Sequence, residues 1–116
     1  MEFPVTVPLY RSKAEFFRAL GHPIRIRLLE LVSERDHAVH ELRDAIDIEA
    51  SNLSHQLAVL RQNGLVNQQR DGGEVIYSLA VPEVRDLLRA ARSILVTRSS
   101  DRGEFVDEVS RESNKG

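Results

Sequence analysis

The sequence predicts a mainly α-helical fold that carries one β-hairpin, with about five helices and two strands. Apolar residues recur at helical spacing along most of the chain, and one such stripe holds Leu53, Leu57 and Leu60. Between residues 68 and 79 the spacing changes to alternation around an Asp71-Gly72-Gly73 turn, which is a strong hairpin signal. A short helix, a tight turn, a second helix and then a hairpin together indicate a winged helix-turn-helix.

Composition limits the possible function classes. A chain of 116 residues is large enough for one domain with its own core. The absence of cysteine excludes disulfides, thiolate metal sites and thiol chemistry. The sequence has no apolar run of membrane-spanning length and no leader, so we expect a cytoplasmic, nucleoid-associated protein without membrane contact. The formal net charge of −2 comes from residues 99–116, which leaves room for a local basic surface on the rest.

Three regions are expected along the chain. Residues 1–11 form an N-terminal arm interrupted by prolines, residues 12–98 form the domain, and residues 99–116 form a polar and disordered tail. The first helix is predicted to start at a capping box made by Ser12 and Glu15. Its buried side is expected to hold Phe16, Phe17 and Leu20.

The second helix is predicted from Pro23, which suits a first helical turn, to about Ser33. Arg25 and Arg27 are expected to point outward, and the core side is expected to hold Ile24, Leu28, Leu31 and Val32. A third, short helix is predicted over residues 37–46, with its apolar side formed by Val39, Leu42 and Ile46.

The next helix, residues 50–62, has an unusual outer face. Its polar side chains are short-armed hydrogen-bonding groups, whereas a face that meets only water more often carries Glu and Lys. Such groups suit base edges and phosphates in a major groove; on residue types alone, the alternative is a polar face that meets only solvent. The polar residues concerned are Ser51, Asn52, Ser54, His55, Gln56 and Arg61. The hairpin over residues 68–79 is the predicted wing, with Arg70 and Gly72 at its tip and Val75, Tyr77 and Leu79 on one strand face.

A last helix is predicted after Pro82, with a wide apolar stripe. We expect this stripe to be shared with a second subunit; the alternative is that it packs only on its own domain. The stripe consists of Val84, Leu87, Leu88, Ala91, Ile94 and Leu95.

Three segments resemble the ArsR/SmtB family of winged-helix regulators. They are Phe17 to Leu29, Ser51 to Val66, and Arg70 to Leu79, in the family's order and spacing. The resemblance covers roughly residues 12–96. It implies a homodimer formed by the first and last helices, with an interface holding Phe16, Leu20, Val84, Leu87, Leu88, Ala91, Ile94 and Leu95.

The resemblance also implies which residues meet double-stranded DNA. Bases and nearby phosphates would contact Ser51, Asn52, Ser54, His55 and Gln56. The DNA backbone would contact Arg61, Arg70 and Gly72. The operator would be an inverted repeat with half-site centres ~34 Å apart. His55 has an alternative role as a helix residue held by polar neighbours, and His22 is expected to be structural, bonding at a helix start.

Metal sensing, common in the family, has few candidate ligands here. The cysteines of the family's third-helix pattern fall on Ala38 and His40, and of its last-helix site only Glu83 could ligate a metal. His37, His40 and Glu41 could offer imidazole and carboxylate to nickel or zinc as an effector. The alternative is that these histidines are simply solvated, and no cofactor is required.

The leading hypothesis is a dimeric transcriptional regulator, expected to repress, whose effector is a metal, a small molecule, a protein co-regulator or nothing. The alternative is a winged-helix protein-interaction module or a partner-dependent regulator. An enzyme is not supported, because adjacent Ser54 and His55 diverge by ~100° on a helix and cannot form a nucleophile–base pair.

Overall fold

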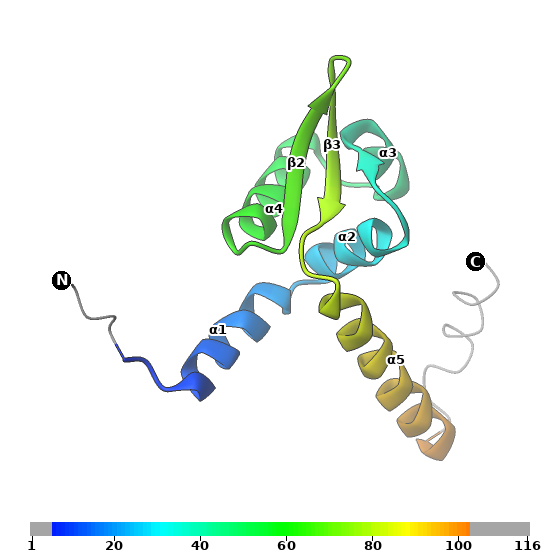
Figure 1. Ribbon diagram of the computed structural model, residues 1–116. Helices are drawn as coiled ribbons and strands as arrows, with labels where there is room; N and C mark the ends of the chain where they lie inside the picture. Colours follow the sequence, from blue (N-terminus) through cyan, green and yellow to red (C-terminus); the bar gives the residue numbers. More distant parts are fainter. Residues whose placement is uncertain (1–5, 103–116) are drawn as a thin grey trace. The chain divides into compact units, whose positions relative to one another are not determined.

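The computed structural model describes residues 6–102, so the predictions for residues 1–5 and 103–116 lie outside the described residues. The described chain comprises two compact units, one ending at Val81 and the other starting at Pro82. The elements (Figure 1) are, in chain order, α1 (Leu9–Leu20), α2 (Pro23–Glu34), β1 (His37–Ala38), α3 (Val39–Ala45), α4 (Ala50–Gln62), β2 (Val66–Asp71), β3 (Glu74–Leu79) and α5 (Glu83–Arg102).

Helix α1 begins earlier than predicted. It starts at Leu9, directly after Pro8, whose carbonyl accepts the backbone N–H of Arg11 at 2.9 Å. The predicted capping box is therefore wrong. Ser12 lies inside the helix, and Glu15 accepts a hydrogen bond from Arg18 at 2.8 Å. Leu20 is buried and Phe16 half-buried as expected, but Phe17 is 54% exposed.

Helix α2 forms the centre of the core and begins as predicted. The Nδ1 atom of His22 accepts the backbone N–H of Ile24 at 3.1 Å, and Pro23 lies in the first turn. The expected structural role of His22 is confirmed. The buried residues of α2 are Leu28, Leu29, Leu31 and Val32, of which Leu29 was not predicted.

The third predicted helix is shorter, because its first two residues form a strand. His37 and Ala38 pair antiparallel with Tyr77 and Ile76 of β3, and α3 starts only at Val39. A strand of two residues shows no detectable alternation, so the sequence pattern could not reveal it. Leu42 and Ile46 are buried as predicted.

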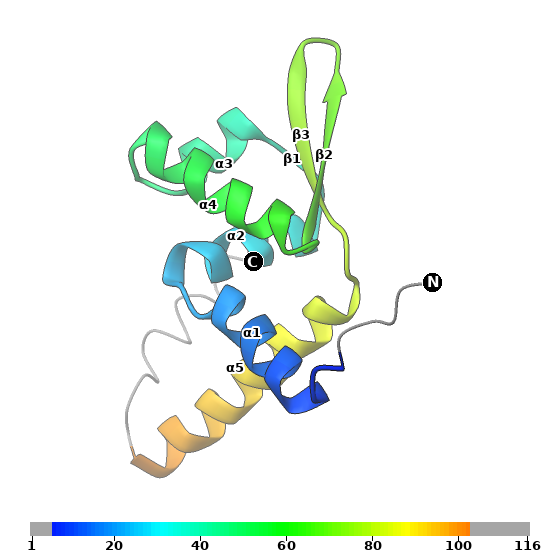
Figure 2. The same ribbon diagram turned by 90° about the vertical axis from the view of Figure 1, so that its left-hand side faces the viewer.

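The predicted hairpin is confirmed and is longer than the range 68–79. Strands β2 and β3 pair from Val66–Leu79 to Asp71–Glu74, in a sheet of order β1-β3-β2. Gly72 and Gly73 form the turn with φ values of 58° and 88°, as a tight two-residue turn requires. The hairpin, called the wing below, projects beyond α3 and α4 (Figure 2).

Helix α4 occupies its predicted range and is fixed by its apolar stripe. It packs against α2 and β2, while α3 packs against β1 and β3. Leu53, Leu57 and Leu60 are each at most 2% exposed. Burying each such side chain contributes about 1.5–3 kcal/mol, so this stripe fixes which side of α4 faces solvent.

Helix α5 follows Pro82 as predicted and carries Glu83 and Asp86 in its first turn, where carboxylates suit the helix dipole. It continues through residues 99–102, which the sequence assigned to the tail. Ile94 is 59% and Leu95 47% exposed. No helix within residues 6–102 is both long and apolar enough to cross a membrane.

Candidate nucleic-acid interface

The exposed side of α4 presents four of the five residues predicted to contact bases. Ser51, Asn52, Ser54 and His55 are exposed, while the leucine stripe between them is buried. A helix carrying several hydrogen-bonding groups on a solvent face matches the requirements for contacting base edges in a major groove. The contact itself stays a prediction.

Gln56 departs from its predicted place on this face. It is only 5% exposed. Its Oε1 atom accepts a hydrogen bond from Nη1 of Arg25 at 2.9 Å, and its Nε2 atom donates to Oδ1 of Asn52 at 3.0 Å. Gln56 is therefore bound inside the protein and does not lie on the exposed face of α4. The sequence did hold a signal, because position 56 lies three residues after Leu53, on the buried stripe.

Arg25 does not point outward as predicted. Besides Gln56, it binds the end of α1: its Nε donates to the carbonyl of Ala19 at 2.6 Å and its Nη2 to that of Arg18 at 3.3 Å. Carbonyls in the last turn of a helix have no partner within the helix, so Arg25 caps α1 while it holds Gln56. Arg27, two residues on, is exposed as predicted and pairs with Glu30 at 3.3 Å.

The wing supplies the other predicted contacts. Arg70 lies exposed on β2, opposite Val75, and Gly72 lies in the turn that follows. Arg61, near the end of α4, is exposed and donates to Oε1 of Gln68 on β2. This bond joins α4 to the wing, so Arg61 has a structural partner besides any phosphate.

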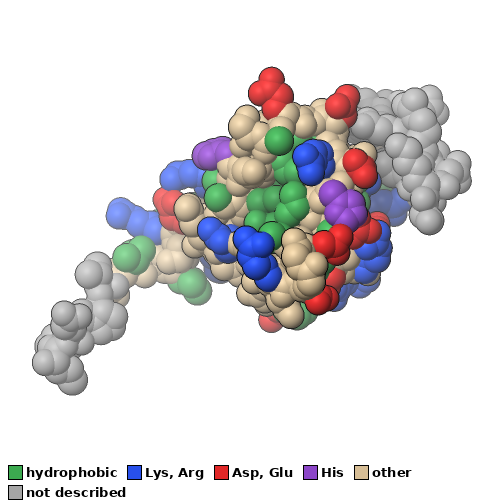
Figure 3. Space-filling model, turned by 90° about the horizontal axis from the view of Figure 1, so that it is seen from above, with side chains coloured by type: hydrophobic (Ala, Val, Ile, Leu, Met, Phe, Trp, Pro, Cys, Tyr) green, Lys and Arg blue, Asp and Glu red, His purple; other side chains and the backbone are tan. Residues whose placement is uncertain are grey.

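Charges on this side of the molecule are mixed. Seen from above, basic, acidic and histidine side chains are interspersed around a small apolar area (Figure 3). Near the turn, Asp71 pairs in register with Glu74, whose carboxylate lies 3.6 Å from Nδ1 of His40. Attraction to phosphate therefore depends on individual cations rather than on a broad basic surface.

The metal-ligand candidates do not come together. His37 belongs to β1 rather than to a helix, is 5% exposed, and has Nδ1 2.8 Å from the carbonyl of Arg35. The prediction that His37 and His40 lie in one helix is therefore wrong. Glu83 lies in the other unit, on α5. Within residues 6–102, no three His, Asp or Glu side chains are grouped to hold a metal ion.

Glu41 is also engaged elsewhere. Its Oε1 accepts the backbone N–H of Ala38 at 2.9 Å, and its Oε2 accepts Nη2 of Arg35 at 3.0 Å. The Ala38 bond, and then the Arg35 bond, lower the pKa of this carboxyl from 4.5 to about 2. Glu41 thus caps the start of α3.

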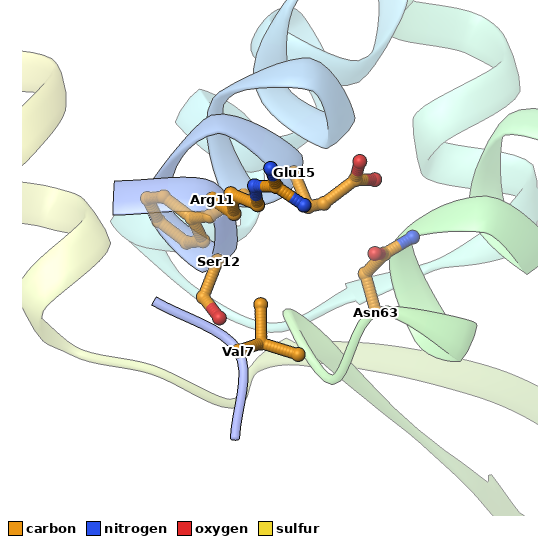
Figure 4. A pocket seen from close by; sticks show the side chains of 6 residues that line it. Val7, Arg11, Ser12, Glu15 and Asn63 are labelled. Atoms are coloured by element: carbon orange, nitrogen blue, oxygen red, sulfur yellow. The ribbon is translucent and has the colours of Figure 1, made fainter. Parts of the chain in front are cut away.

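A shallow hollow of about 530 Å³ lies beside the start of α1 (Figure 4). Its walls are formed by four residues of α1, by Val7 before that helix and by Asn63 after α4; those of α1 are Arg11, Ser12, Glu15 and Phe16. It arises where α1 meets the turn after α4, a contact between distant segments that no local pattern predicts. Its one carboxylate, on Glu15, is already paired with Arg18.

The residues predicted for a dimer interface divide into two groups. Leu20 and Val84 are 5% and 1% exposed in the single chain, so they have little surface left to bury. The others keep free surface: Phe16, Leu87 and Leu88 are half-buried, and Ala91, Ile94 and Leu95 are exposed. Three further apolar residues of α1 are more than half exposed: Leu9 and Tyr10, which were not predicted for the interface, and Phe17, which was predicted to be buried.

Known proteins are similar to this chain in sequence and in fold. The family described as bacterial regulatory protein, arsR family, matches residues 22–68. The HTH-type transcriptional regulator Rv0081 of Mycobacterium tuberculosis is 50% identical over 103 residues, or 88% of this chain and 90% of that protein. Its crystal structure matches with a TM-score of 0.76, covering 84% of this chain and 98% of that one at 52% identity.

Two further relatives carry more specific descriptions. The transcriptional repressor SmtB homolog of Synechocystis is 42% identical over 79 residues, 68% of this chain and 60% of that protein. The homodimeric winged helix-turn-helix DNA-binding domain of Mb0332 from Mycobacterium bovis matches with a TM-score of 0.68 at 23% identity. That match covers 82% of this chain and 88% of the solved one, and it supports the fold alone.

The predicted fold is thus confirmed, and the relatives are transcriptional regulators rather than enzymes. In helix-turn-helix proteins the second helix of the motif enters the major groove, and α4 is that helix in this chain. The chain belongs to the ArsR family of winged helix-turn-helix transcriptional regulators.

Proposed function

We propose that the protein is a homodimeric repressor that binds an inverted-repeat operator through α4 and the wing. The observation that carries the proposal is the exposed row of Ser51, Asn52, Ser54 and His55 on a helix anchored by buried leucines. The repressor role follows the description of the Synechocystis relative.

Dimerisation rests on exposed apolar surface. Tyr10 and Phe17 on α1, and Ile94 and Leu95 on α5, are each about half exposed or more. Such surface on a small chain favours burial against a second copy. Two copies related by a two-fold axis would carry two α4 helices to half-sites ~34 Å apart.

The test is a fluorescence-anisotropy titration of the protein on DNA from upstream of its own gene, at several salt concentrations. We expect saturable, salt-dependent binding. His55→Ala should weaken binding to the upstream fragment that the wild type binds specifically, by about 1–3 kcal/mol, and relax the preference for particular bases. Gln62→Ala, also exposed on α4 but outside the proposed contact set, is the matched control and should bind like the wild type.

The outcomes discriminate between functions. Equal losses on specific and unrelated DNA would make His55 a phosphate contact or a structural residue. No salt-dependent binding to any fragment of the genome would overturn the proposal and favour a protein-interaction module.

Metal response is a separate arm of the same titration. The proposal requires no metal, so nickel, zinc and cobalt, each added after chelator, should leave the affinity unchanged. A shift caused by one metal, and abolished by His40→Ala, would instead support metal sensing at that histidine.

A further inference from the structure

A chain of three polar side chains links the end of α1 to the exposed face of α4. Arg25 contacts the carbonyls of Arg18 and Ala19, then Gln56, and Gln56 contacts Asn52. Arg25 is half-buried and Gln56 is buried, whereas Asn52 is exposed. The chain therefore ends at a residue in the proposed DNA-contacting row.

The chemistry of arginine determines which end of the Gln56 amide faces each neighbour. A guanidinium group has only donors, so the atom of Gln56 that faces Nη1 of Arg25 has to be the acceptor, Oε1. The Nε2 group of Gln56 then points the other way and donates to Oδ1 of Asn52. An isolated glutamine could turn either end toward a neighbour, and Arg25 removes that freedom.

The direction reaches the surface at Asn52. With its Oδ1 held by Gln56, Asn52 directs its Nδ2 group, which carries two donors, away from the interior bond. A donor at this position favours acceptors on DNA. In the major groove these are N7 and O6 of guanine, N7 of adenine and O4 of thymine.

We propose that Arg25 is a positioning residue for operator recognition, which acts through Gln56 to present Asn52 as a donor to a base edge. The inference rests on the proposed function and deepens it. Three of the five N–H donors of Arg25 are used within the protein, so the proposal assigns it an action through Gln56 rather than a DNA contact of its own. Asn52 makes the contact, and Arg25 sets which bases it prefers.

The geometry requires arginine and not merely a positive charge. Three acceptors from two helices surround a rigid planar fork, with distances of 2.6, 2.9 and 3.3 Å. A lysine ammonium is a compact charge on a flexible stem and cannot hold the same three acceptors in the same directions. Arg25→Lys thus removes the fixed orientation while it keeps the charge.

The experiment compares bound sequences selected from a randomised DNA duplex pool by the full-length wild type, Asn52→Ala, Arg25→Lys and the control Arg27→Lys. Arg27 lies on the same helix, but it is exposed and pairs only with Glu30 among the contacts described for it. Asn52→Ala identifies the base pair concerned. Arg25→Lys should reduce preference at that base pair by roughly five- to tenfold, which is part of what a good side-chain contact contributes.

Affinity for unrelated DNA and its salt dependence should not change in Arg25→Lys, because the charge is kept. Arg27→Lys should select the wild-type sequence. Unchanged preference in Arg25→Lys would overturn the proposal, as would an equal loss of affinity on all sequences, which indicates a purely structural role.

A second variant covers the case in which Arg25→Lys does not fold. Gln56→Met removes the amide at similar length and leaves the two carbonyl contacts of Arg25 to α1 in place. It should relax preference at the same base pair as Asn52→Ala. Wild-type preference in Gln56→Met would overturn the proposal as well.

An NMR measurement on the DNA-free protein separates this inference from the proposed function. The side-chain amide signals of Asn52 and Gln56 should move in Arg25→Lys and stay in place in Arg27→Lys. A wild type without sequence preference would overturn the proposed function, yet Arg25-dependent signals would still support the orientation of Asn52. Signals that ignore Arg25 would overturn the orientation itself.

Discussion

The carboxylate of Glu41, a single half-buried residue, stabilises the start of α3. The N-cap residue of α3 is Ala38, whose methyl group cannot accept a hydrogen bond. Glu41 satisfies the backbone N–H of Ala38 from inside the helix, and Arg35 holds the carboxylate in place. Both bonds are stronger with the ionised carboxylate than with the neutral acid, so the start of α3 is sensitive to acid.

Stability should follow this carboxyl at low pH. Its pKa is about 2 in the folded protein and 4.5 ordinarily. A lowered pKa means that the stabilisation is complete above pH 4.5 and is lost as the pH falls toward 2. Glu41→Gln should therefore lose less free energy of unfolding than the wild type over that range, as measured by urea denaturation. Glu34→Gln, at the exposed end of α2, is the control, and parallel curves for wild type and Glu41→Gln would exclude the role.

The hydrogen-bond partners of individual side chains were harder to predict from the sequence than the secondary structure was. The sequence placed Leu53, Leu57 and Leu60 inside correctly, because leucine at helical spacing has one favourable environment. It placed Arg25 and Gln56 outside, because long polar side chains are usually solvated. Their burial depends on each satisfying the other across two helices, which no spacing rule encodes.

At the scale of elements, the wing depends on its turn. Gly72 has φ of 58°, and a Cβ atom added there would meet nothing within 4 Å. Substitution at this position therefore costs conformational energy and not steric contact. Gly72→Val should destabilise the protein by about 1–2 kcal/mol, whereas Gly72→Asn, which tolerates positive φ, should cost much less. Chemical denaturation of both variants checks this, and equal losses would show that the turn changes conformation instead.

The wing should also contribute charge to binding. Arg70→Ala is expected to weaken binding to specific and unrelated DNA alike and to flatten the salt dependence by about one phosphate. The exposed arginine Arg43 on α3 provides the control variant Arg43→Ala. Anisotropy titrations at several salt concentrations measure both slopes. If the slope of Arg70→Ala matched that of the wild type, this side chain would not touch phosphate.

Element boundaries followed local signals where those existed. The glycine turn and the leucine spacing gave the wing and α4 correctly, and Pro23 with His22 gave the start of α2. The start of α1 and the strand β1 were missed. The start of α1 depends on the carbonyl of Pro8, and β1 depends on pairing with β3. Neither feature produces a periodic pattern of apolar residues in the sequence.

At the scale of the whole molecule, DNA affinity should depend on assembly. Ile94→Glu should yield a monomer, because it places a charge on exposed apolar surface of the predicted interface. Affinity for a full operator should then fall toward that of one half-site, since joint binding of two α4 helices is lost. Sedimentation velocity gives the oligomeric state. Thr97→Glu, exposed on the same helix, tests charge alone, and a dimeric Ile94→Glu would move the interface elsewhere.

The short strand β1 has a consequence for how the wing can change over evolution. Among residues 6–102, its two residues pair with Ile76 and Tyr77 alone, and no third strand lies beside the outer part of the hairpin, residues 70–75. Insertions, deletions or charge changes there leave the hydrophobic core and the α4 anchor untouched. The outer hairpin is therefore the segment in which a change of length should reduce the stability of the fold least. It is also a suitable place to graft a longer loop when binding to a new target is to be engineered.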